Sequence, residues 1–212
     1  MSTSRSNRAD ERLRPALEAL AAADIDMARA YESCGLPPAR RAEPGFPGLF
    51  RMIAAQQVSA GAARAILARV DEALGEVTPA AVAEAGEDEL RAAGLSRQKI
   101  VYAKSMAEAA LAGRIDFEGL DGLPDRQVIE QLTQLKGIGR WTAEIYLLFA
   151  LDRPDVFPAG DLALQVAAQR LKGLRKRPNE KYLRRIAAKW RPYRGPAARF
   201  LWHIYRHPGM PD

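Results

Sequence analysis

The sequence predicts an all-α protein made of many short helices joined by tight turns. Alanine, leucine, arginine and glutamate, residues that favour helices, dominate the chain. The alternation of β-branched or aromatic residues with polar ones that is typical of strands is missing. With 212 residues, of which 48% are hydrophobic, the chain can bury a core as one compact unit or as two small lobes.

The helices are expected from their hydrophobic spacing and from their start and stop signals. Ser59 and Ser96 stand where an N-cap is needed. Three helices are each followed by a glycine that can end them: Gly75, Gly94 and Gly113. The expected helices span residues 10–22, 24–33, 46–57, 60–75, 78–84, 87–93, 96–112, 125–133, 140–151, 161–171, 179–190 and 195–206.

A glycine pair interrupts an apolar, helix-forming stretch, LKGIGRWTAEIYLL at 135–148. Apolar residues at helical spacing precede and follow the pair, which indicates a helix, a tight turn and a second helix. Glycine can take a positive φ and lets the backbone approach a partner closely. The N–H groups of the turn and of the second helix's first residues lack helical partners, so this hairpin favours binding an anion.

The net charge of +6 is concentrated toward the C-terminus. Residues 170–206 hold thirteen Lys or Arg and a single acid, Glu180, whereas residues 1–169 hold more acids than bases. Attraction to phosphates supplies most non-specific affinity for nucleic acids, so this segment favours a polyanion as its partner. Charge alone leaves open the alternative of a solvated helix face in an arginine-rich proteome.

Composition also excludes several classes of protein. A single cysteine, Cys34, excludes a disulfide framework and any four-cysteine metal or iron–sulfur site, and it favours a reducing compartment. The two histidines, His203 and His207, lie on one C-terminal helix without acidic company, so no metal site is expected from them. No export signal and no apolar run long enough to span a bilayer is evident. We expect a soluble, cytoplasmic protein, associated with the nucleoid if it is bacterial.

The hairpin and the segment after it resemble a known family. The hairpin at 135–143, followed by DVFPAGDLALQ with Asp161, resembles the helix-hairpin-helix superfamily of base-excision DNA glycosylases, and within it the 3-methyladenine DNA glycosylase II branch. Such hairpins also occur in many non-catalytic DNA-binding proteins, so the combination with the aspartate carries the resemblance. Three further segments agree with it, and together they extend it from about residue 45 to the C-terminus: FRMIAAQQVSAGAARAI, AAGLSRQKIVYAKSMAEAALAG and KWRPYRGPAARFLWHIYRH.

The resemblance implies two helical lobes with an active-site cleft between them. One lobe would span 46–157 and carry the hairpin at 133–142. The other would combine 1–45 with 158–212 and carry the catalytic aspartate and the basic segment. The proline- and glycine-rich stretch GLPPARRAEPGFPG independently indicates a lobe boundary near residue 45. Some relatives have an N-terminal β-domain for which this chain has no room.

The resemblance assigns DNA contacts to the hairpin. Main-chain N–H groups around Gly137 and Gly139 would grip a phosphate, and a β-carbon at either position would hold the DNA away. Lys136 stands where relatives often have proline, which makes the turn less rigid but adds a positive charge. The hairpin residues expected to contact DNA are Gly137, Ile138, Gly139, Arg140 and Thr142.

Carbonyls of such hairpins bind a monovalent cation in relatives. Here Na⁺ or K⁺ would lie against the main-chain carbonyls of Thr133, Leu135 and Ile138. The resemblance implies no other cofactor and no iron–sulfur cluster.

The resemblance assigns catalysis to Asp161. At the first turn of a helix, the helix dipole and the free N–H groups favour its ionised form. A carboxylate there can stabilise the positive charge that grows on the sugar as the base leaves, and it can orient the attacking water. An aspartate at a helix start is otherwise most often a simple N-cap.

Gln57 matches the position of the side chain that, in relatives, fills the hole left in the DNA by a flipped base.

The base pocket is expected to be aromatic and apolar. Trp141 matches a tryptophan that lines the pocket in this branch, and Tyr205 falls where the branch has another tryptophan. Ile145 and Leu162 replace tyrosines of some relatives, which leaves the lesion spectrum open. On periodicity alone, Trp141 and Tyr205 would more often be core residues, and Trp190, Trp202 and Tyr193 are expected in the core.

Trp141 also occupies the position at which bifunctional members carry a lysine nucleophile. No Schiff base can form there, so we expect a monofunctional enzyme that stops at the abasic site. Its expected partner is double-stranded DNA with damaged bases, its substrate class alkylated purines, and its state a monomer. Two alternatives stay open: a glycosylase for deaminated or other neutral lesions, and a non-catalytic DNA-binding protein.

Overall fold

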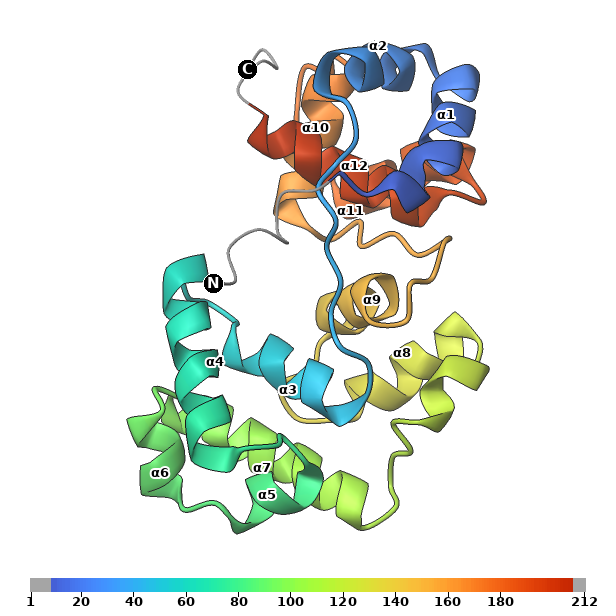
Figure 1. The fold of residues 1–212 in the computed structure, drawn as a ribbon. Coiled ribbons are helices and arrows are strands. Elements are labelled where there is room, and N and C mark those ends of the chain that lie inside the picture. The colour runs from blue at the N-terminus through green and yellow to red at the C-terminus, as the bar shows by residue number, and fades with distance from the viewer. Residues whose placement is uncertain (1–8, 208–212) are drawn as a thin grey trace. The chain divides into compact units, whose positions relative to one another are not determined.

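The computed structural model describes residues 9–207 and confirms the all-α fold (Figure 1). These residues contain no β-strand beyond one isolated antiparallel bridge between Ala9 and Pro38. No helix among them is long and apolar enough to cross a membrane. The described α-helices are α1 (Arg14–Ala23), α2 (Ile25–Cys34), α3 (Gly45–Ala54), α4 (Ala60–Leu74), α5 (Pro79–Glu84), α6 (Glu87–Ala92), α7 (Arg97–Leu111), α8 (Asp125–Thr133), α9 (Arg140–Phe149), α10 (Leu162–Leu171), α11 (Glu180–Ala187) and α12 (Arg194–Arg206).

Short 3₁₀ segments complete the described elements, at Glu11–Leu13, Gly119–Gly122 and Ala188–Trp190. The first and the last lie inside the helices expected at 10–22 and 179–190. Gly119–Gly122 had no counterpart among the expected helices.

The start and stop signals act as the sequence predicts. The Ser59 hydroxyl accepts a hydrogen bond from the Ala62 N–H at 3.2 Å, and the Ser96 hydroxyl accepts one from Lys99 at 3.4 Å. The three glycines after helix ends all have positive φ, with 66° at Gly75, 100° at Gly94 and 66° at Gly113. These signals operate within a few residues, which is why the sequence alone locates them.

Two helices end earlier than expected. The helix expected at 46–57 ends at Ala54, because the Lys99 ammonium donates to the Ala54 carbonyl at 2.7 Å and Gln57 turns left-handed with φ 55°. The helix expected at 140–151 ends at Phe149, and Asp152 then has φ 52°. Pro154 disfavours helix at the residue before it, so the chain cannot continue helically there.

The chain forms two compact units. One comprises Ala42–Leu151; the other combines Met1–Arg41 with Asp152–Asp212, of which 9–41 and 152–207 are described. The boundaries fall before the expected ones at 45/46 and 157/158. The reason is local: the Ala42 N–H donates to the Phe149 carbonyl, whereas Asp152 forms ion pairs with Arg12 and Arg199.

The core of the Ala42–Leu151 unit centres on α9. Every residue of α9 from Thr142 to Phe149 is buried. Tyr146, fully buried, accepts a hydrogen bond from the Gly45 N–H at 2.7 Å, which ties the start of α3 to α9. Burial raises the pKa of the Tyr146 hydroxyl. The helix that follows the glycine turn is therefore held rigidly by the interior of its unit.

In the other unit, a half-buried polar cluster holds one end of α10. Asp24 caps α2, and both of its carboxylate oxygens accept hydrogen bonds from the Lys172 ammonium at 2.6 Å. The same carboxylate accepts the Trp190 indole N–H at 2.9 Å. Burial alone would raise the pKa of Asp24, but these hydrogen bonds hold it below its usual range. Lys172 follows the last residue of α10, so the cluster fixes the C-terminal end of that helix.

Candidate active site and glycine hairpin

The glycine turn joins α8 to α9 as a compact hairpin. Gly137 has φ 82°, a conformation that other residues adopt only with strain. A β-carbon there would lie 2.2 Å from the ring of Tyr102 in α7. Ile138 is buried beneath the turn and donates its N–H to the Leu135 carbonyl at 3.1 Å. Gly137 is thus required by the fold of the hairpin itself.

Gly139 differs from Gly137 in this respect. It is the N-cap of α9, with φ −88° and ψ 170°, and a β-carbon on it would meet nothing within 4 Å. No side chain caps this end of the helix. The first-turn N–H groups of α9 and the positive end of its dipole therefore face open space at a position with no side chain. The expectation that a β-carbon at either glycine would hold the DNA away stays a prediction; at Gly137 the added β-carbon would also meet the Tyr102 ring within the fold.

Arg140 and Thr142 follow Gly139 with opposite exposures. The Arg140 guanidinium is largely exposed and donates to the buried carboxylate of Glu144 at 2.9 Å. This pairing holds a positive charge in the first turn of α9, and a buried carboxylate needs such a partner. Thr142 is buried, and its hydroxyl accepts from Gln56 at 3.4 Å. What Thr142 can offer to a ligand is therefore its main-chain N–H, not its side chain.

Gln57 lies at the exposed tip of the turn between α3 and α4. Its φ of 55° is uncommon for a residue other than glycine, and such strain persists only where neighbours enforce it. Gln56, bonded to Thr142, and Lys99, bonded to Ala54, supply that enforcement from α9 and α7. The turn that presents Gln57 is thus fastened to the second helix of the hairpin.

Asp161 is the N-cap of α10. Its Oδ1 accepts the Leu164 N–H at 3.0 Å and the indole N–H of Trp202 at 3.2 Å, and the Asp161 N–H donates to Pro158 at 2.9 Å. Half-buried and fixed by α10 and α12, the carboxylate has a defined orientation. The charge of Arg40 interacts favourably with it.

Trp202 is the functional neighbour that the sequence did not reveal. It was expected in the core but is only half-buried, and its indole points its N–H to Asp161. The two residues lie 41 positions apart, and no local pattern connects them. Tyr193 was also expected in the core and is 37% exposed, so that expectation is wrong, whereas Trp190 is confirmed as a core residue.

The residues expected to line a base pocket are distributed over both units. Trp141 and Ile145 lie one turn apart on α9; Trp141 is 45% exposed and Ile145 is nearly buried. Leu162, next to Asp161 at the start of α10, and Tyr205 on α12 are also exposed. The Arg170 guanidinium lies 5.9 Å from the centre of the Tyr205 ring, a cation–π contact. Trp141 and Tyr205 are therefore surface aromatics, not core residues.

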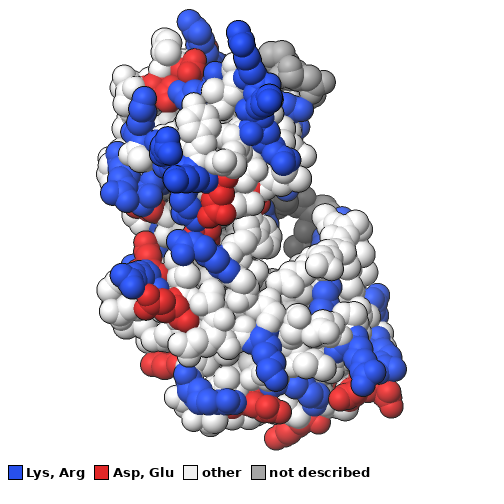
Figure 2. All heavy atoms as spheres, turned by 180° about the vertical axis from the view of Figure 1, so that it is seen from behind, with Lys and Arg blue, Asp and Glu red and all other residues white. Residues whose placement is uncertain are grey.

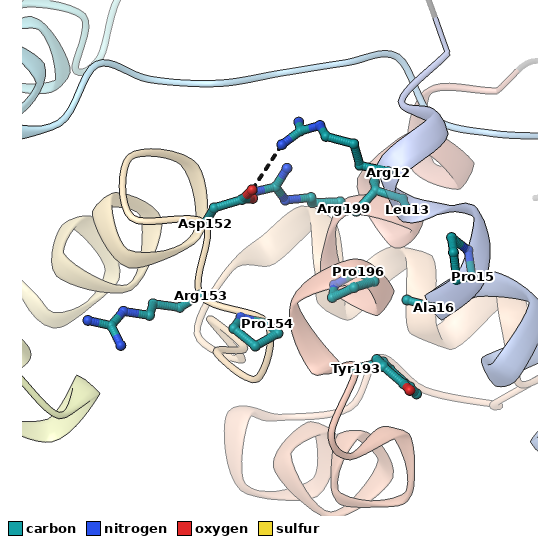
Figure 3. Close-up of a pocket in the computed structure, with 10 residues that line it drawn as sticks. All are labelled: Arg12, Leu13, Pro15, Ala16, Asp152, Arg153, Pro154, Tyr193, Pro196 and Arg199. Atoms are coloured by element: carbon teal, nitrogen blue, oxygen red, sulfur yellow. Dashed lines mark hydrogen bonds and ion pairs between the residues drawn. The ribbon is translucent and has the colours of Figure 1, made fainter. Parts of the chain in front are cut away.

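A cavity of about 290 Å³ lies in the unit that carries Asp161, but none of the expected site residues lines it (Figure 3). Its walls combine prolines with the ion pairs between Asp152 and the guanidinium groups of Arg12 and Arg199. This network joins the segment before α1 to the start of the 152–158 connection and to α12. Arg12 and Arg199 at the cavity therefore stabilise the fold through Asp152.

The expected cation ligands lie where α8 ends. Thr133 is the last residue of α8, so its carbonyl lies at the negative end of the helix dipole. The Leu135 carbonyl accepts one hydrogen bond, from Ile138, and a carbonyl oxygen has a second lone pair. Neutral carbonyl oxygens at a helix C-terminus suit a hard monovalent cation, so the donor set fits Na⁺ or K⁺.

This combination of hairpin and capped aspartate defines a class of protein. Residues 50–192 match the HhH-GPD superfamily of base excision DNA repair proteins, and the chain belongs to this family.

Particular members of the family resemble the chain over most of its length. DNA-3-methyladenine glycosylase 1 of Schizosaccharomyces pombe is 38% identical over 161 residues, which cover 74% of this chain and 71% of that protein. A solved structure of the S. pombe 3-methyladenine DNA glycosylase in complex with abasic DNA superposes with a TM-score of 0.80 at 36% identity, covering 89% of this chain and 95% of that one. The structure of a DNA-3-methyladenine glycosidase from Bacillus halodurans also superposes with a TM-score of 0.80. It is 35% identical and covers 91% of this chain and 89% of that one.

Proposed function

We propose that this protein is a monofunctional DNA glycosylase that flips out N3- or N7-methylated purines and hydrolyses their N-glycosidic bond in base excision repair. The observation that carries the proposal is the Asp161 carboxylate, fixed at the start of α10 by Leu164 and Trp202. The relatives support it, because they are named 3-methyladenine DNA glycosylases and one was solved with abasic DNA, the product of base removal.

Asp161 acts on the sugar in this proposal. As the bond between C1′ and the base nitrogen breaks, positive charge develops on the sugar ring, and a fixed carboxylate stabilises it. Water then attacks C1′ and gives up a proton, which the carboxylate can accept or direct. The bonds from Leu164 and Trp202 to Oδ1 orient the group before the reaction, so no reorganisation is needed in the transition state.

The hairpin grips the DNA backbone without reading sequence. The first-turn N–H groups of α9 bind a phosphate across Gly139, and the Arg140 guanidinium adds a charge-assisted contact. Ile138 supports the turn from within the fold. The main-chain carbonyls of Thr133, Leu135 and Ile138 would hold the proposed Na⁺ or K⁺, which would supply positive charge for the phosphate contact. Gln57 fills the stack where the base has left.

Trp141 recognises the damaged base by charge. A purine methylated at N3 or N7 carries a formal positive charge, and the face of an indole attracts a cation by about 0.5 to 2 kcal/mol. Such a base is also a good leaving group and needs no protonation by the protein. Because Trp141 stands where bifunctional members carry the lysine nucleophile, the reaction stops at the abasic site. Ile145, one turn along α9, and Leu162 and Tyr205, on the unit that carries Asp161, remain the other predicted pocket residues.

The test is release of free bases from methylated DNA. Duplex treated with a methylating agent is incubated with the protein, and the soluble products are separated by chromatography. Release of 3-methyladenine or 7-methylguanine without strand breaks supports the proposal. No release from the methylated duplex, together with release of hypoxanthine from a matched duplex that carries it, would favour the deamination alternative. Binding without release from either duplex would favour a non-catalytic DNA-binding protein. A monomeric state and a cytoplasmic location remain predictions.

A further inference from the structure

The basic segment at 170–206 divides into cations that hold the fold and cations that face solvent. Lys172 pairs with Asp24, Arg194 donates to Asp155 at 2.7 Å, and the buried Arg199 donates to Asp152 at 2.6 Å. Lys172 and Arg194 cannot be given up to a ligand without unpairing half-buried acids, and Arg199 is itself buried against its partner. Only some of the positive charges in this segment are therefore available to a ligand.

The solvent-facing cations form a row along α11. Lys181, Arg185 and Lys189 are exposed and recur every fourth residue, so they share one face of α11 and the 3₁₀ turn after it. The opposite face, with Leu183 and Ala187, is buried. We name the three exposed cations the α11 basic stripe. Figure 2 shows Lys and Arg side chains gathered on the surface of this unit.

The stripe carries little opposing charge. Glu180 is the one acid between residues 173 and 189, and its carboxylate is bound by Arg184 at 2.7 Å. The loop before α11 adds three more exposed cations: Arg175, Lys176 and Arg177. Four helical residues rise about 6 Å, so the charges of the stripe are spaced on the order of neighbouring phosphates along one strand.

α11 begins beside the candidate catalytic turn. The Glu180 carboxylate lies 3.5 Å from where a β-carbon on Gly160 would be, and Gly160 directly precedes Asp161. α10 and α11 pack against each other in the same unit. A nucleotide that reaches Asp161 brings its flanking phosphates over the surface next to this turn.

We propose that the α11 basic stripe is a second phosphate-contacting surface, which holds the DNA backbone beside the nucleotide being excised. It is separate from the glycine hairpin and rests on the proposed function for the identity of its DNA. Its contacts are to phosphates, so binding through it is independent of sequence and weakens steeply with salt.

The experiment measures binding of an undamaged duplex by fluorescence anisotropy between 50 and 200 mM KCl. The test variant is Lys181→Gln/Arg185→Gln/Lys189→Gln. The matched control is Arg29→Gln/Arg91→Gln/Arg114→Gln, which removes the same charge at three exposed positions on other elements. Removing one cation that neutralises a phosphate lowers the slope of log K against log salt by about 0.9.

The expected result is a slope smaller by about 2 to 3 and an affinity at 100 mM salt about tenfold or more weaker in the test variant. The control should change its affinity less than about threefold, and Lys181→Arg/Arg185→Lys/Lys189→Arg should bind like the unmodified protein. An unchanged slope, or an equal loss in the control, would overturn the proposal. The proposal would also be overturned if the unmodified protein bound single-stranded RNA or anionic vesicles more tightly than duplex DNA, and if the test variant lost that tighter binding.

The duplex in this experiment contains no lesion. Its result therefore measures the contribution of the α11 basic stripe to DNA binding, whether or not the unmodified protein releases methylated bases. The base-release assay tests the proposed function separately, so failure of the stripe proposal is distinguishable from failure of the proposed function.

Discussion

The two glycines of the hairpin should respond oppositely to a single added methyl group. In Gly137→Ala, alanine must adopt φ near 82° and its β-carbon meets the Tyr102 ring at 2.2 Å. The left-handed conformation costs about 1 to 2 kcal/mol and overpacking about 1 to 3 kcal/mol, so we expect stability to fall by roughly 2 to 5 kcal/mol. In Gly139→Ala the β-carbon enters open space, and the decrease should not exceed about 1 kcal/mol.

The affinity for DNA, in contrast to the stability, should be sensitive to a β-carbon at Gly139. Gly139→Ala should weaken binding on the order of tenfold, about equally for duplexes of different sequence, because the added β-carbon holds a backbone phosphate away and no base is read there. Gly122→Ala is the matched control, since its β-carbon also meets nothing within 4 Å and Gly122 lies in the same unit but outside the hairpin.

Denaturant unfolding and anisotropy on two unrelated duplexes measure both effects. Replacing Tyr102 by leucine in the Gly137→Ala background should recover part of the stability, which isolates the steric cost. Unchanged stability in Gly137→Ala would refute the structural reason given for that glycine. Unchanged affinity in Gly139→Ala, or a decrease confined to one sequence, would refute close approach of a phosphate.

Three further predictions concern stability, chemistry and substrate. Asp24→Asn should lower the free energy of unfolding by about 2 to 4 kcal/mol at neutral pH. The pKa of Asp24 is lower in the folded protein than the usual 3.8. The stabilisation by its carboxylate is therefore present above pH 3.8 and is lost as the pH falls through the lower pKa of the folded protein. The difference between Asp24→Asn and the unmodified protein should therefore shrink in acid; a pH-independent difference would contradict the role of the ion pair. Borohydride added during turnover should trap no covalent complex, because Trp141 replaces the amine nucleophile; a stable adduct would show that another amine reaches the sugar. Single-turnover excision of 7-methylguanine or 3-methyladenine should be much faster than that of hypoxanthine, and Trp141→Ala should narrow the gap; equal rates in the unmodified protein would point to a proton donor and to neutral lesions.

The sequence predicted those features that depend on short-range patterns. The caps at Ser59 and Ser96 and the glycine stops act over three or four residues, so spacing alone locates them. The early end of the helix expected at 46–57 has a long-range cause, since Lys99 binds the Ala54 carbonyl from 45 residues away. No short window of sequence contains both partners.

The candidate site also has features that the sequence predicted and features that it could not. The hairpin and Asp161 were found from contiguous motifs, whereas the bond from Trp202 to Asp161 and the close approach of Gly137 to Tyr102 arise only when distant helices pack. Thr142 shows the same limit: the hairpin pattern predicts a DNA contact there, and packing against Gln56 leaves its main-chain N–H, not its side chain, for that contact. Residue type and spacing identify a motif, and tertiary packing decides which of its atoms reach the surface.

Asp161→Asn tests the central proposal most directly. Asparagine is as good an N-cap as aspartate, and its carbonyl oxygen can still accept from Leu164 and Trp202, so the fold of the site should be kept. Excision of 7-methylguanine under single-turnover conditions should fall by about a hundredfold or more, while duplex affinity is equal or higher because a negative charge is removed. An unchanged excision rate in a folded, DNA-binding Asp161→Asn protein would contradict the catalytic role of this carboxylate.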